Sequence, residues 1–413
     1  MNSDMRGFND DMIQVDAALE KILSSINKIG DEDISIANAL GRVLAEDLIS
    51  RVDHPPNRVS AMDGYAVRSK DINSPPPVRL KQVGESSAGN RFNGLLKELQ
   101  TIRIFTGARI PENADTIIIQ ENVIKEKEHI LIQKTEVPGK YIRQSGLDFK
   151  KGDVLLKSGT RLNFRNIALI AAMNIAWIKV TRKPRIAIFS SGSELVYPGD
   201  EIGPDQIISS NSIGLSALIE ASGGSPINLG IAIDDMSIIR QKLSNLMNVD
   251  LLVTIGGASV GDYDLIRRIL GEAKNKIKIS RVAMRPGKPL IFGKLQGIPI
   301  LGLPGNPVSA GVTAILYLVP AINKLVGSDN YQNPIESAIT TINLEKNDSR
   351  QDYLRAKLSR KKNGELSATP FNYQDSSMLL NFAKAECLII RAPFAKALKK
   401  GNRVKIIRLD YFS

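Results

Sequence analysis

Cysteine and histidine are scarce in this sequence of 413 residues, which contains one cysteine, Cys387, and two histidines, His54 and His129. A single thiol forms no disulfide within the chain. This fits a reducing compartment, and we expect the cytoplasm. With so few thiols and imidazoles, a zinc site of histidine and cysteine or a histidine-based triad is not expected. Carboxylates, hydroxyls and cations are therefore expected to carry any chemistry.

Long apolar segments are also missing. Residues 1–12 contain no apolar core like that of a signal peptide, so no export signal is expected. The longest nearly apolar stretch, residues 308–322, includes a serine, a glycine, a threonine and a proline. It is shorter than the roughly 20 residues that span a bilayer. We therefore expect no membrane association.

Aromatic residues make up only 5% of the chain, and no basic stretch is interleaved with them. Lysine and arginine number 55 against 43 aspartates and glutamates, a formal net charge of +12. Charge alone admits nucleic acid, an acidic membrane surface or a small anionic substrate. Because no aromatic-rich basic stripe or nucleic-acid motif is present, we expect no nucleic-acid partner and favour small anionic substrates.

The hydrophobic pattern divides the chain into four predicted domains. A helical N-terminal domain is expected over residues 1–53 and 147–182, interrupted by a β-rich insertion over residues 54–146. Strands and helices alternate over residues 183–327, which predicts a parallel sheet with helices on both faces. A second β module, expected to be structural, covers residues 334–413.

The period of the apolar residues also predicts the individual elements. Helices are expected around residues 15–23, 34–41, 165–176, 215–219, 239–247 and 308–325. Strands outside the α/β domain are expected at residues 78–83, 101–105, 116–120, 129–134, 337–344, 352–358, 385–391 and 403–408. Strands within it are expected at residues 185–189, 226–232, 250–255, 278–283, 289–292 and 298–301.

Three loops of the α/β domain are the first places to seek a ligand, because ligands bind beyond the carboxyl ends of parallel strands. The loop GGASVGDYD, residues 256–264, offers glycine backbone and a helix N-terminus for an anion, or two aspartates for a divalent cation. A tight strand-to-helix turn with aspartate caps is the alternative. RPGKP, residues 285–289, places two cations on a stiff turn.

The third loop, GLPGNPVS at residues 302–309, leads into the last helix and is predicted to be a second anion site. Its alternative is a plain helix start with Asn306 as N-cap and Pro307 at the first helical position. Glu194, Asp234 and Asp264 follow different strands of the same predicted sheet. We expect them to converge, as carboxylates of a metal or acid–base site would.

The N-terminal half contributes SAMDGYA at residues 60–66, TGA at 106–108 and SGLD at 145–148, which are typical of turns when taken alone. Together with the three loops, these segments resemble the molybdopterin molybdenumtransferases, the MoeA family, to which the E domain of gephyrin also belongs. The resemblance covers nearly the whole chain. It implies a multidomain α/β fold with a three-layer α/β/α domain similar to MoaB and Mog proteins, a discontinuous N-terminal helical region, a small β-rich insertion and a C-terminal β-barrel-like domain.

The activity implied by the resemblance is insertion of molybdate into adenylylated molybdopterin, with release of AMP and help from Mg²⁺. Glu194, Asp234 and Asp264 would hold the Mg²⁺ ion. The expected catalytic residues are Asp63, Thr106, Asp148, Glu194, Asp234, Asp264 and Lys288. The expected residues for molybdate and adenylyl-molybdopterin are Ser191, Gly256, Gly257, Ser259, Gly261, Asp262, Arg285, Pro304, Gly305, Asn306 and Ser309.

In that family the active cleft lies at a dimer interface, so the resemblance implies a homodimer in which Asp63, Thr106 and Asp148 serve the partner's site. It also implies transient contacts with the molybdopterin adenylyltransferase and with molybdoenzyme chaperones. One alternative is the adenylyltransferase itself, whose domain resembles residues 183–327. Another is a non-catalytic scaffold like the E domain of gephyrin. A single α/β copy flanked by transferase-type domains favours the transferase.

Overall fold

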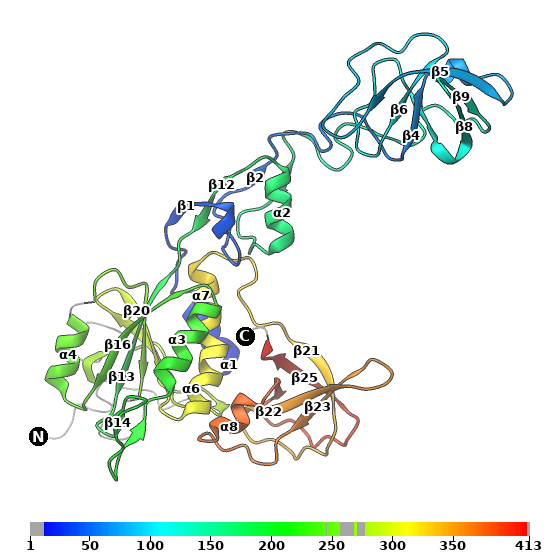
Figure 1. Cartoon of the computed structure of the whole chain (residues 1–413). Coiled ribbons are helices and arrows are strands. Elements are labelled where there is room, and N and C mark those ends of the chain that lie inside the picture. Colours follow the sequence, from blue (N-terminus) through cyan, green and yellow to red (C-terminus); the bar gives the residue numbers. More distant parts are fainter. Residues whose placement is uncertain (1–11, 245, 257–267, 271–276, 411–413) are drawn as a thin grey trace, which may run out of the picture. The chain divides into compact units, whose positions relative to one another are not determined.

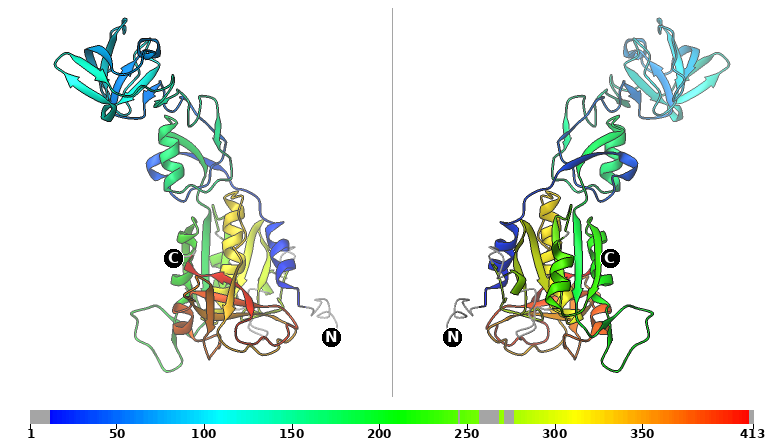
Figure 2. Two further views of the ribbon diagram at one scale, coloured as in Figure 1. Left: turned by 90° about the vertical axis from the view of Figure 1, so that its right-hand side faces the viewer. Right: turned by 90° about the vertical axis from the view of Figure 1, so that its left-hand side faces the viewer.

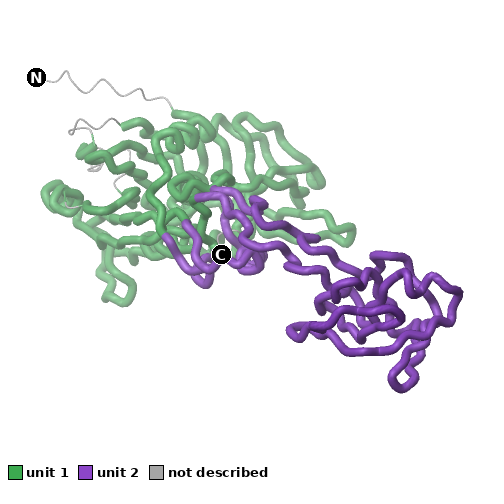
Figure 3. Tube along the Cα trace, turned by 90° about the horizontal axis from the view of Figure 1, so that it is seen from above, with its two compact units in different colours: residues 1–32, 41–45, 180–413 green, residues 33–40, 46–179 purple. Residues whose placement is uncertain are grey.

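The computed structural model describes residues 12–244, 246–256, 268–270 and 277–410. Two compact units make up the chain, coloured separately in Figure 3. Unit 1 contains Met1–Glu32, Gly41–Ala45 and Val180–Ser413, and unit 2 contains Asp33–Leu40 and Glu46–Lys179. The boundaries expected for the four domains remain predictions.

A five-stranded sheet forms the centre of unit 1, with the strand order β16-β13-β17-β20-β19. The first four strands are parallel, whereas β19 runs antiparallel to β20. Their bounds are Arg185–Ser191 for β13, Ser225–Ala232 for β16, Leu251–Ile255 for β17, Ile291–Leu295 for β19 and Ile298–Leu303 for β20. Every residue of β17 is buried, as expected for a strand covered on both faces.

Helices cover both faces of this sheet (Figure 1). On one face pack α1 (Val15–Leu23), α3 (Asn211–Ala221) and the long helix Pro307–Leu325, and on the other packs α4 (Met236–Ser244). Figure 2 shows the long helix, in yellow, beside the green α3. This arrangement confirms the expected three-layer α/β/α domain. Two short strands, β14 (Leu195–Val196) and β15 (Ile207–Ile208), form a separate ribbon.

The long helix consists of α6 (Pro307–Thr313), a π turn (Ala314–Leu318) and α7 (Val319–Leu325). Pro320 lacks the N–H that would continue the α ladder, and the π turn lies directly before it. By length and composition this helix could cross a membrane, but 83% of its most apolar window is buried inside the protein. Its apolar residues are therefore those of a core helix.

The C-terminal part of unit 1 is a closed barrel of five strands, because β22 pairs with both β23 and β24 in the order β22-β23-β21-β25-β24. The strands are β21 (Glu336–Thr340), β22 (Gln351–Arg360), β23 (Leu366–Pro370), β24 (Cys387–Arg391) and β25 (Arg403–Arg408), with one helical turn, α8 (Leu379–Ala383). Burial inside the barrel raises the pKa of the Cys387 thiol to about 12. The β-barrel-like domain is therefore confirmed, although β23 was not predicted.

Unit 2 contains a six-stranded sheet in the order β7-β4-β6-β5-β9-β8. Its strands are β4 (Gly64–Val67), β5 (Val78–Ser86), β6 (Gln100–Ile104), β7 (Thr116–Ile119), β8 (Val123–Glu126) and β9 (His129–Ile132). The smaller elements are β2 (Leu48–Ile49), β3 (Val59–Ser60), β10 (Ile142–Arg143), β11 (Val154–Leu156), α2 (Phe164–Ala172) and the 3-10 turns Ile36–Asn38, Ser69–Ile72 and Gln120–Asn122. Strands β1 (Asp31–Ser35) and β12 (Trp177–Thr181) pair with each other. The helix α2 starts with a capping box between Asn163 and Asn166.

Two predicted elements are wrong. Residues 278–283 are not a strand of the central sheet: Ile279 and Val282 make isolated bridges to Phe292 and Ile13. The chain then enters β18 (Met284–Arg285), which pairs with β22 of the barrel. Residues 34–41 are not a helix either, because Ile34 belongs to β1 and the Ser35 hydroxyl accepts from the N–H of Ala37 to start a 3-10 turn.

Candidate functional site

The carboxyl ends of β13, β17 and β20 lie side by side, and the residues at these ends are in close backbone contact. Gly256, directly after β17, has φ +84°, and a Cβ there would lie 2.4 Å from the carbonyl oxygen of Ser191. A Cβ on Gly305, which follows β20, would lie 3.9 Å from Cα of Gly256. The structure thus brings together three expected substrate residues, Ser191, Gly256 and Gly305, at the edge where parallel sheets bind ligands.

The start of α6 is held by two neighbouring segments. Asn306 occupies the N-cap position but makes no side-chain cap; its Nδ2 donates to Oγ of Ser376 at 2.8 Å. The N–H of Val308 donates to the carbonyl of Ser376 at 3.1 Å. Asn211 of α3 donates to the carbonyl of Gly305 at 2.7 Å. The alternative interpretation, a helix start with Asn306 as N-cap and Pro307 at the first helical position, thus agrees with the structure in position, although the Asn306 side chain makes no capping hydrogen bond.

The cationic turn, residues 285–288, packs against the same helix. Gly287 has φ +106°, and a Cβ there would lie 2.5 Å from Cγ2 of Thr313. The hydroxyl of Thr313 in turn donates to the carbonyl of Ser309, one helical turn earlier, at 2.7 Å. Lys288 is half-buried, and no carboxylate among the described residues pairs with its ammonium group. The turn that carries Arg285 and Lys288 thus packs against the helix that carries Ser309. Pro304, which precedes this helix, is buried.

Arg285 has acidic neighbours that the sequence analysis missed. Its guanidinium pairs with Asp352 and, at 3.2 Å, with Asp348, and the hydrogen bond to Asp352 is the main reason why its pKa is raised. Its side chain is still 47% exposed. Asp348 and Asp352 lie more than 60 residues along the chain, so only the pairing of β18 with β22 could have revealed them.

Glu194 and Asp234, two of the three expected metal ligands, lie close enough to repel each other. Partial burial raises the pKa of Asp234, a hydrogen bond from the backbone of Ser193 opposes this, and the negative charge of Glu194 adds to the rise. The N–H of Asp234 also donates to Oγ of Ser193 at 3.3 Å. Among the described residues, no three carboxylate, imidazole or thiol groups form a metal-binding cluster. Asp264 lies outside the described residues, as do Gly257, Ser259, Gly261 and Asp262.

In unit 2, the structure joins two expected catalytic residues directly. Oδ1 of Asp63 accepts from the N–H of Thr106 at 2.7 Å. This bond, then one with the Thr106 side chain, lowers the pKa of Asp63. Asp148 is exposed, and its N–H donates to the carbonyl of His54 at 3.0 Å. No described hydrogen bond connects Asp148 with Asp63 or Thr106.

Arg103 is a further charged group beside Asp63 that the sequence analysis missed. Its guanidinium lies over the rings of Tyr65 and Phe105, 5.1 and 5.0 Å from their centroids, and adds a smaller lowering effect to the pKa of Asp63. Tyr65 lies in the motif that carries Asp63, and Phe105 directly precedes Thr106, so an arginine on β6 between the two motifs was the available signal.

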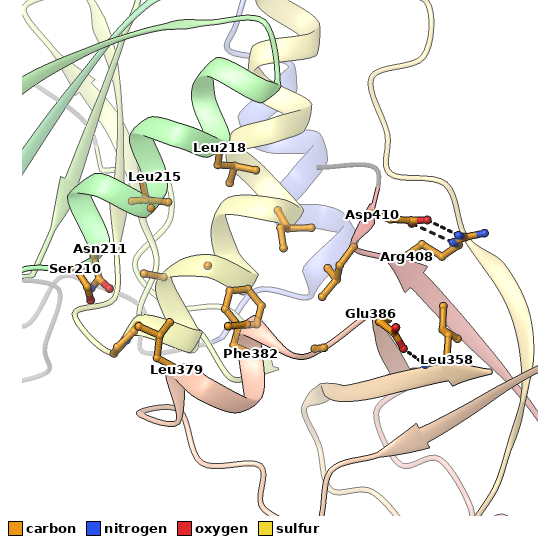
Figure 4. A pocket seen from close by; sticks show the side chains of 18 residues that line it. Ser210, Asn211, Leu215, Leu218, Leu358, Leu379, Phe382, Glu386, Arg408 and Asp410 are labelled. Atoms are coloured by element: carbon orange, nitrogen blue, oxygen red, sulfur yellow. Dashed lines mark hydrogen bonds and ion pairs between the residues drawn. The ribbon is translucent and has the colours of Figure 1, made fainter. Parts of the chain in front are cut away.

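A cavity of about 640 Å³ opens between α3, α6, α8 and the end of β25 (Figure 4). Apolar side chains such as Leu215, Leu379 and Phe382 line most of it. Glu386, which accepts from the N–H of Leu358 at 2.7 Å, and the Arg408–Asp410 ion pair lie at the barrel side. Asn211 and Pro307 connect this cavity with the Gly305 loop.

The Asp63–Thr106 contact leads to a testable expectation for the pH behaviour of unit 2. Thr106→Ala removes the hydroxyl and keeps the backbone N–H, so we expect the pKa of Asp63 to rise toward the ordinary aspartate value without reaching it. Because the pKa of Asp63 is lower in the folded state than in the unfolded state, the ionised carboxylate stabilises the fold at pH values above the unfolded-state pKa. This stabilisation is lost as the pH falls through the folded-state pKa. The variant should therefore lose the stabilisation at a higher pH than the unmodified protein.

Carboxyl ¹³C NMR titration measures this shift. Asp47 is the internal control, since Lys157 and Ser158 lower its pKa and neither changes in the variant. An unchanged Asp63 titration would show that the Thr106 hydroxyl has no effect on it.

Comparison with known proteins places this architecture in one family. Three family models match in order: "MoeA N-terminal region (domain I and II)" over residues 13–174, "Probable molybdopterin binding domain" over residues 187–324 and "MoeA C-terminal region (domain IV)" over residues 337–409. The molybdopterin molybdenumtransferase of Haemophilus influenzae is 35% identical over 399 residues, covering 96% of this chain and 98% of the relative. That of a Nostoc species is 40% identical over 311 residues, covering 74% and 71%.

Solved structures agree. A molybdopterin biosynthesis MoeA protein from Pyrococcus horikoshii matches with a TM-score of 0.84 and 29% identity, covering 96% of this chain and all of that chain. Another structure of a molybdopterin biosynthesis MoeA protein from Pyrococcus horikoshii matches with a TM-score of 0.81 and 32% identity, covering 98% of this chain and all of that chain. The resemblance inferred from the motifs is confirmed, and the chain belongs to the MoeA family.

Proposed function

We propose that this chain is a molybdopterin molybdenumtransferase that inserts molybdate into adenylylated molybdopterin and releases AMP with the help of Mg²⁺. The observation that carries the proposal is the packing of the cationic turn against the helix that contains Ser309. It lies in a region that matches a probable molybdopterin binding domain, in a chain similar to a molybdopterin molybdenumtransferase over nearly its whole length. Such a reaction needs sites for a tetrahedral oxyanion, a phosphate and a pterin.

Molybdate is the ligand for which the cationic turn is best suited. Arg285 and Lys288 supply charge-assisted hydrogen bonds, which are stronger than neutral ones, and Ser309 and Ser259 add hydroxyl donors. Ser191, Gly256, Gly305 and Asn306 bring backbone close to the same edge of the sheet. Pro304, Gly257, Gly261 and Asp262 complete the proposed set for the adenylyl and pterin groups. Together, the residues of both sets would bind molybdate and adenylyl-molybdopterin side by side.

Glu194, Asp234 and Asp264 are the proposed Mg²⁺ ligands. The donor set fits, because Mg²⁺ prefers carboxylate oxygens and keeps several waters, which the largely exposed Glu194 and Asp234 allow. The mutual repulsion of Glu194 and Asp234 would be relieved by a cation between them. When bound, Mg²⁺ would neutralise the adenylyl phosphate and so favour cleavage of its P–O bond.

Asp63, Thr106 and Asp148 of unit 2 are proposed to serve the active cleft of the partner subunit in a homodimer. The Asp63–Thr106 hydrogen bond supports this, since it holds an ionised carboxylate in one orientation. We further propose transient contacts with the molybdopterin adenylyltransferase and molybdoenzyme chaperones, and a cytoplasmic location. We propose no nucleic-acid partner and no membrane partner.

Incubating the purified protein with adenylylated molybdopterin, Mg²⁺ and molybdate tests the proposal. We expect molybdate-dependent release of AMP and formation of molybdenum cofactor. Absence of such AMP release would overturn the transferase. The adenylyltransferase alternative predicts instead that ATP and molybdopterin yield the adenylylated product, and a scaffold predicts no turnover in either assay.

The metal ligands are tested in the same assay. Asp264→Asn and Asp234→Asn should each abolish turnover and leave the protein folded. Asp235→Asn is the matched control, because the adjacent Asp235 accepts from the N–H groups of Ser237 and Ile238 at the start of α4, a cap that asparagine also provides. If Asp234→Asn and Asp235→Asn have equal activity, the assignment of Asp234 is wrong.

A further inference from the structure

We propose that Asp352 of the C-terminal barrel is a positioning residue for the oxyanion site, and that it acts by holding the guanidinium of Arg285. This inference rests on the proposed function, in which Arg285 binds molybdate. It gives the barrel, expected from the sequence to be structural, an effect on substrate binding through Arg285.

The first observation is the strand pairing that brings the two residues together. β18 runs parallel to β22, and in this register Arg285 lies directly opposite Asp352. The cationic turn starts at Arg285 and packs through Gly287 on Thr313 of the long helix. The turn is therefore fixed to the barrel at one end and to the helix of Ser309 at the other.

The second observation is the burial of Asp352. Its side chain is only 8% exposed, Oδ2 accepts from Arg285, and Oδ1 is buried without a hydrogen-bond partner among the described residues. Arg391 lies opposite Asp352 on β24, but its Nη2 donates to the carbonyls of Glu345 and Lys396. A buried carboxylate needs a paired cation, so Asp352 fixes Arg285 strongly.

The third observation is the share of the Arg285 guanidinium that stays free. Nη2 donates to Asp352 and to Asn347, and Nη1 donates to Asp348. A guanidinium has five N–H donors in a rigid plane, and the side chain is 47% exposed. Three of these donors are thus anchored, and two remain on a guanidinium that is held in place and partly exposed, where an oxyanion can accept from them.

Asp348 offers a natural comparison. It also pairs with Arg285, at 3.2 Å, but it is 48% exposed and is shared with Arg350. Exposed ion pairs contribute little to geometry or stability. Removing either carboxylate takes one negative charge from beside the same guanidinium. The charge effect alone would strengthen binding of an anion in both variants, whereas loss of positioning weakens it only when the buried anchor is lost.

The experiment measures KM for molybdate and kcat in the AMP-release assay, and molybdate binding by equilibrium dialysis. We expect Asp352→Asn to raise KM and the dialysis Kd for molybdate about tenfold with little change in kcat, since losing one well-directed hydrogen bond between charged groups weakens binding by about this factor. Asp348→Asn should leave both constants unchanged or lower them. In an Arg285→Ala background, adding Asp352→Asn should cause no further rise, because the two residues act as a unit.

Arg285→Lys is a second test that leaves the buried carboxylate in place, in case Asp352→Asn fails to fold. Lysine keeps the charge but lacks the planar fork, so it cannot hold Asp352 and an oxyanion in fixed directions, and KM should again rise. Equal KM values for Asp352→Asn and Asp348→Asn, or a wild-type KM in Arg285→Lys, would overturn the inference. Lack of molybdate-dependent AMP release by the unmodified chain would instead overturn the proposed function.

Discussion

Alanine at position 256 should lower turnover by roughly 100-fold or more and also lower Tm. The added Cβ would lie 2.4 Å from the carbonyl oxygen of Ser191, and φ is +84°, a conformation that L side chains rarely adopt. Because the obstacle is backbone, either β13 or the loop after β17 must move, and displacements of about 1 Å near reacting groups cost about this factor in rate. Steady-state kinetics and thermal unfolding measure the two effects.

Gly199→Ala is the control for Gly256→Ala. Gly199 lies in the same unit with φ +97° and has no atom within 4 Å of its hypothetical Cβ. It therefore shares the backbone strain and lacks the collision. A Gly256→Ala protein as active as Gly199→Ala would show that the contact with Ser191 does not shape the site.

Alanine at position 64 should have the largest effect on stability. Gly64 begins β4, which pairs with both β6 and β7, and a Cβ there would lie 2.0 Å from the carbonyl oxygen of Ile118. Neither β6 nor β7 can move away from β4 without breaking backbone hydrogen bonds of the sheet. We therefore expect the free energy of unfolding to fall by about 3 kcal/mol or more, above the usual cost of overpacking. Calorimetry should show the transition of unit 2 at a lower temperature.

Gly30→Ala is the matched control, since Gly30 has no atom within 4 Å of the added Cβ. The free energy of unfolding of Gly30→Ala should differ from that of the unmodified protein by about 0.5 kcal/mol or less. If Gly64→Ala and Gly30→Ala unfolded at the same temperature, the pairing of β4 with β7 would have to accommodate the added Cβ, contrary to our prediction.

The fold was largely predictable because its buried strands differ sharply from their surroundings. β13, β17 and β20 are short apolar runs that end in glycine or serine loops, and these loops correctly located the edge at which Ser191, Gly256 and Gly305 meet. Residues 278–283 misled for a related reason. Ile279 and Val282 are buried, but in isolated bridges, and apolar character alone does not distinguish these from a strand.

The partners of the site residues were not predictable, because they depend on pairing between distant segments. Asp352 is 67 residues from Arg285, and Ser376 is 70 residues from Asn306. Both come from the barrel, whose strands carry no motif that points to the α/β domain. Turn residues can be predicted from local chemistry, whereas the contact between Arg285 and Asp352 depends on the register of β18 and β22.

The pairing of β18 with β22 bears on how far this protein is modular. The two residues of β18 pair with β22 of the barrel, although the strand that follows them in the chain, β19, belongs to the sheet of the α/β domain. The residues proposed to contact molybdate all precede the barrel in sequence, yet one of them, Arg285, lies on β18, a strand of the barrel's sheet. A chain ending before β21 would therefore retain every proposed molybdate contact and lose the support that aims Arg285. The functional boundary of the α/β domain thus lies inside the barrel.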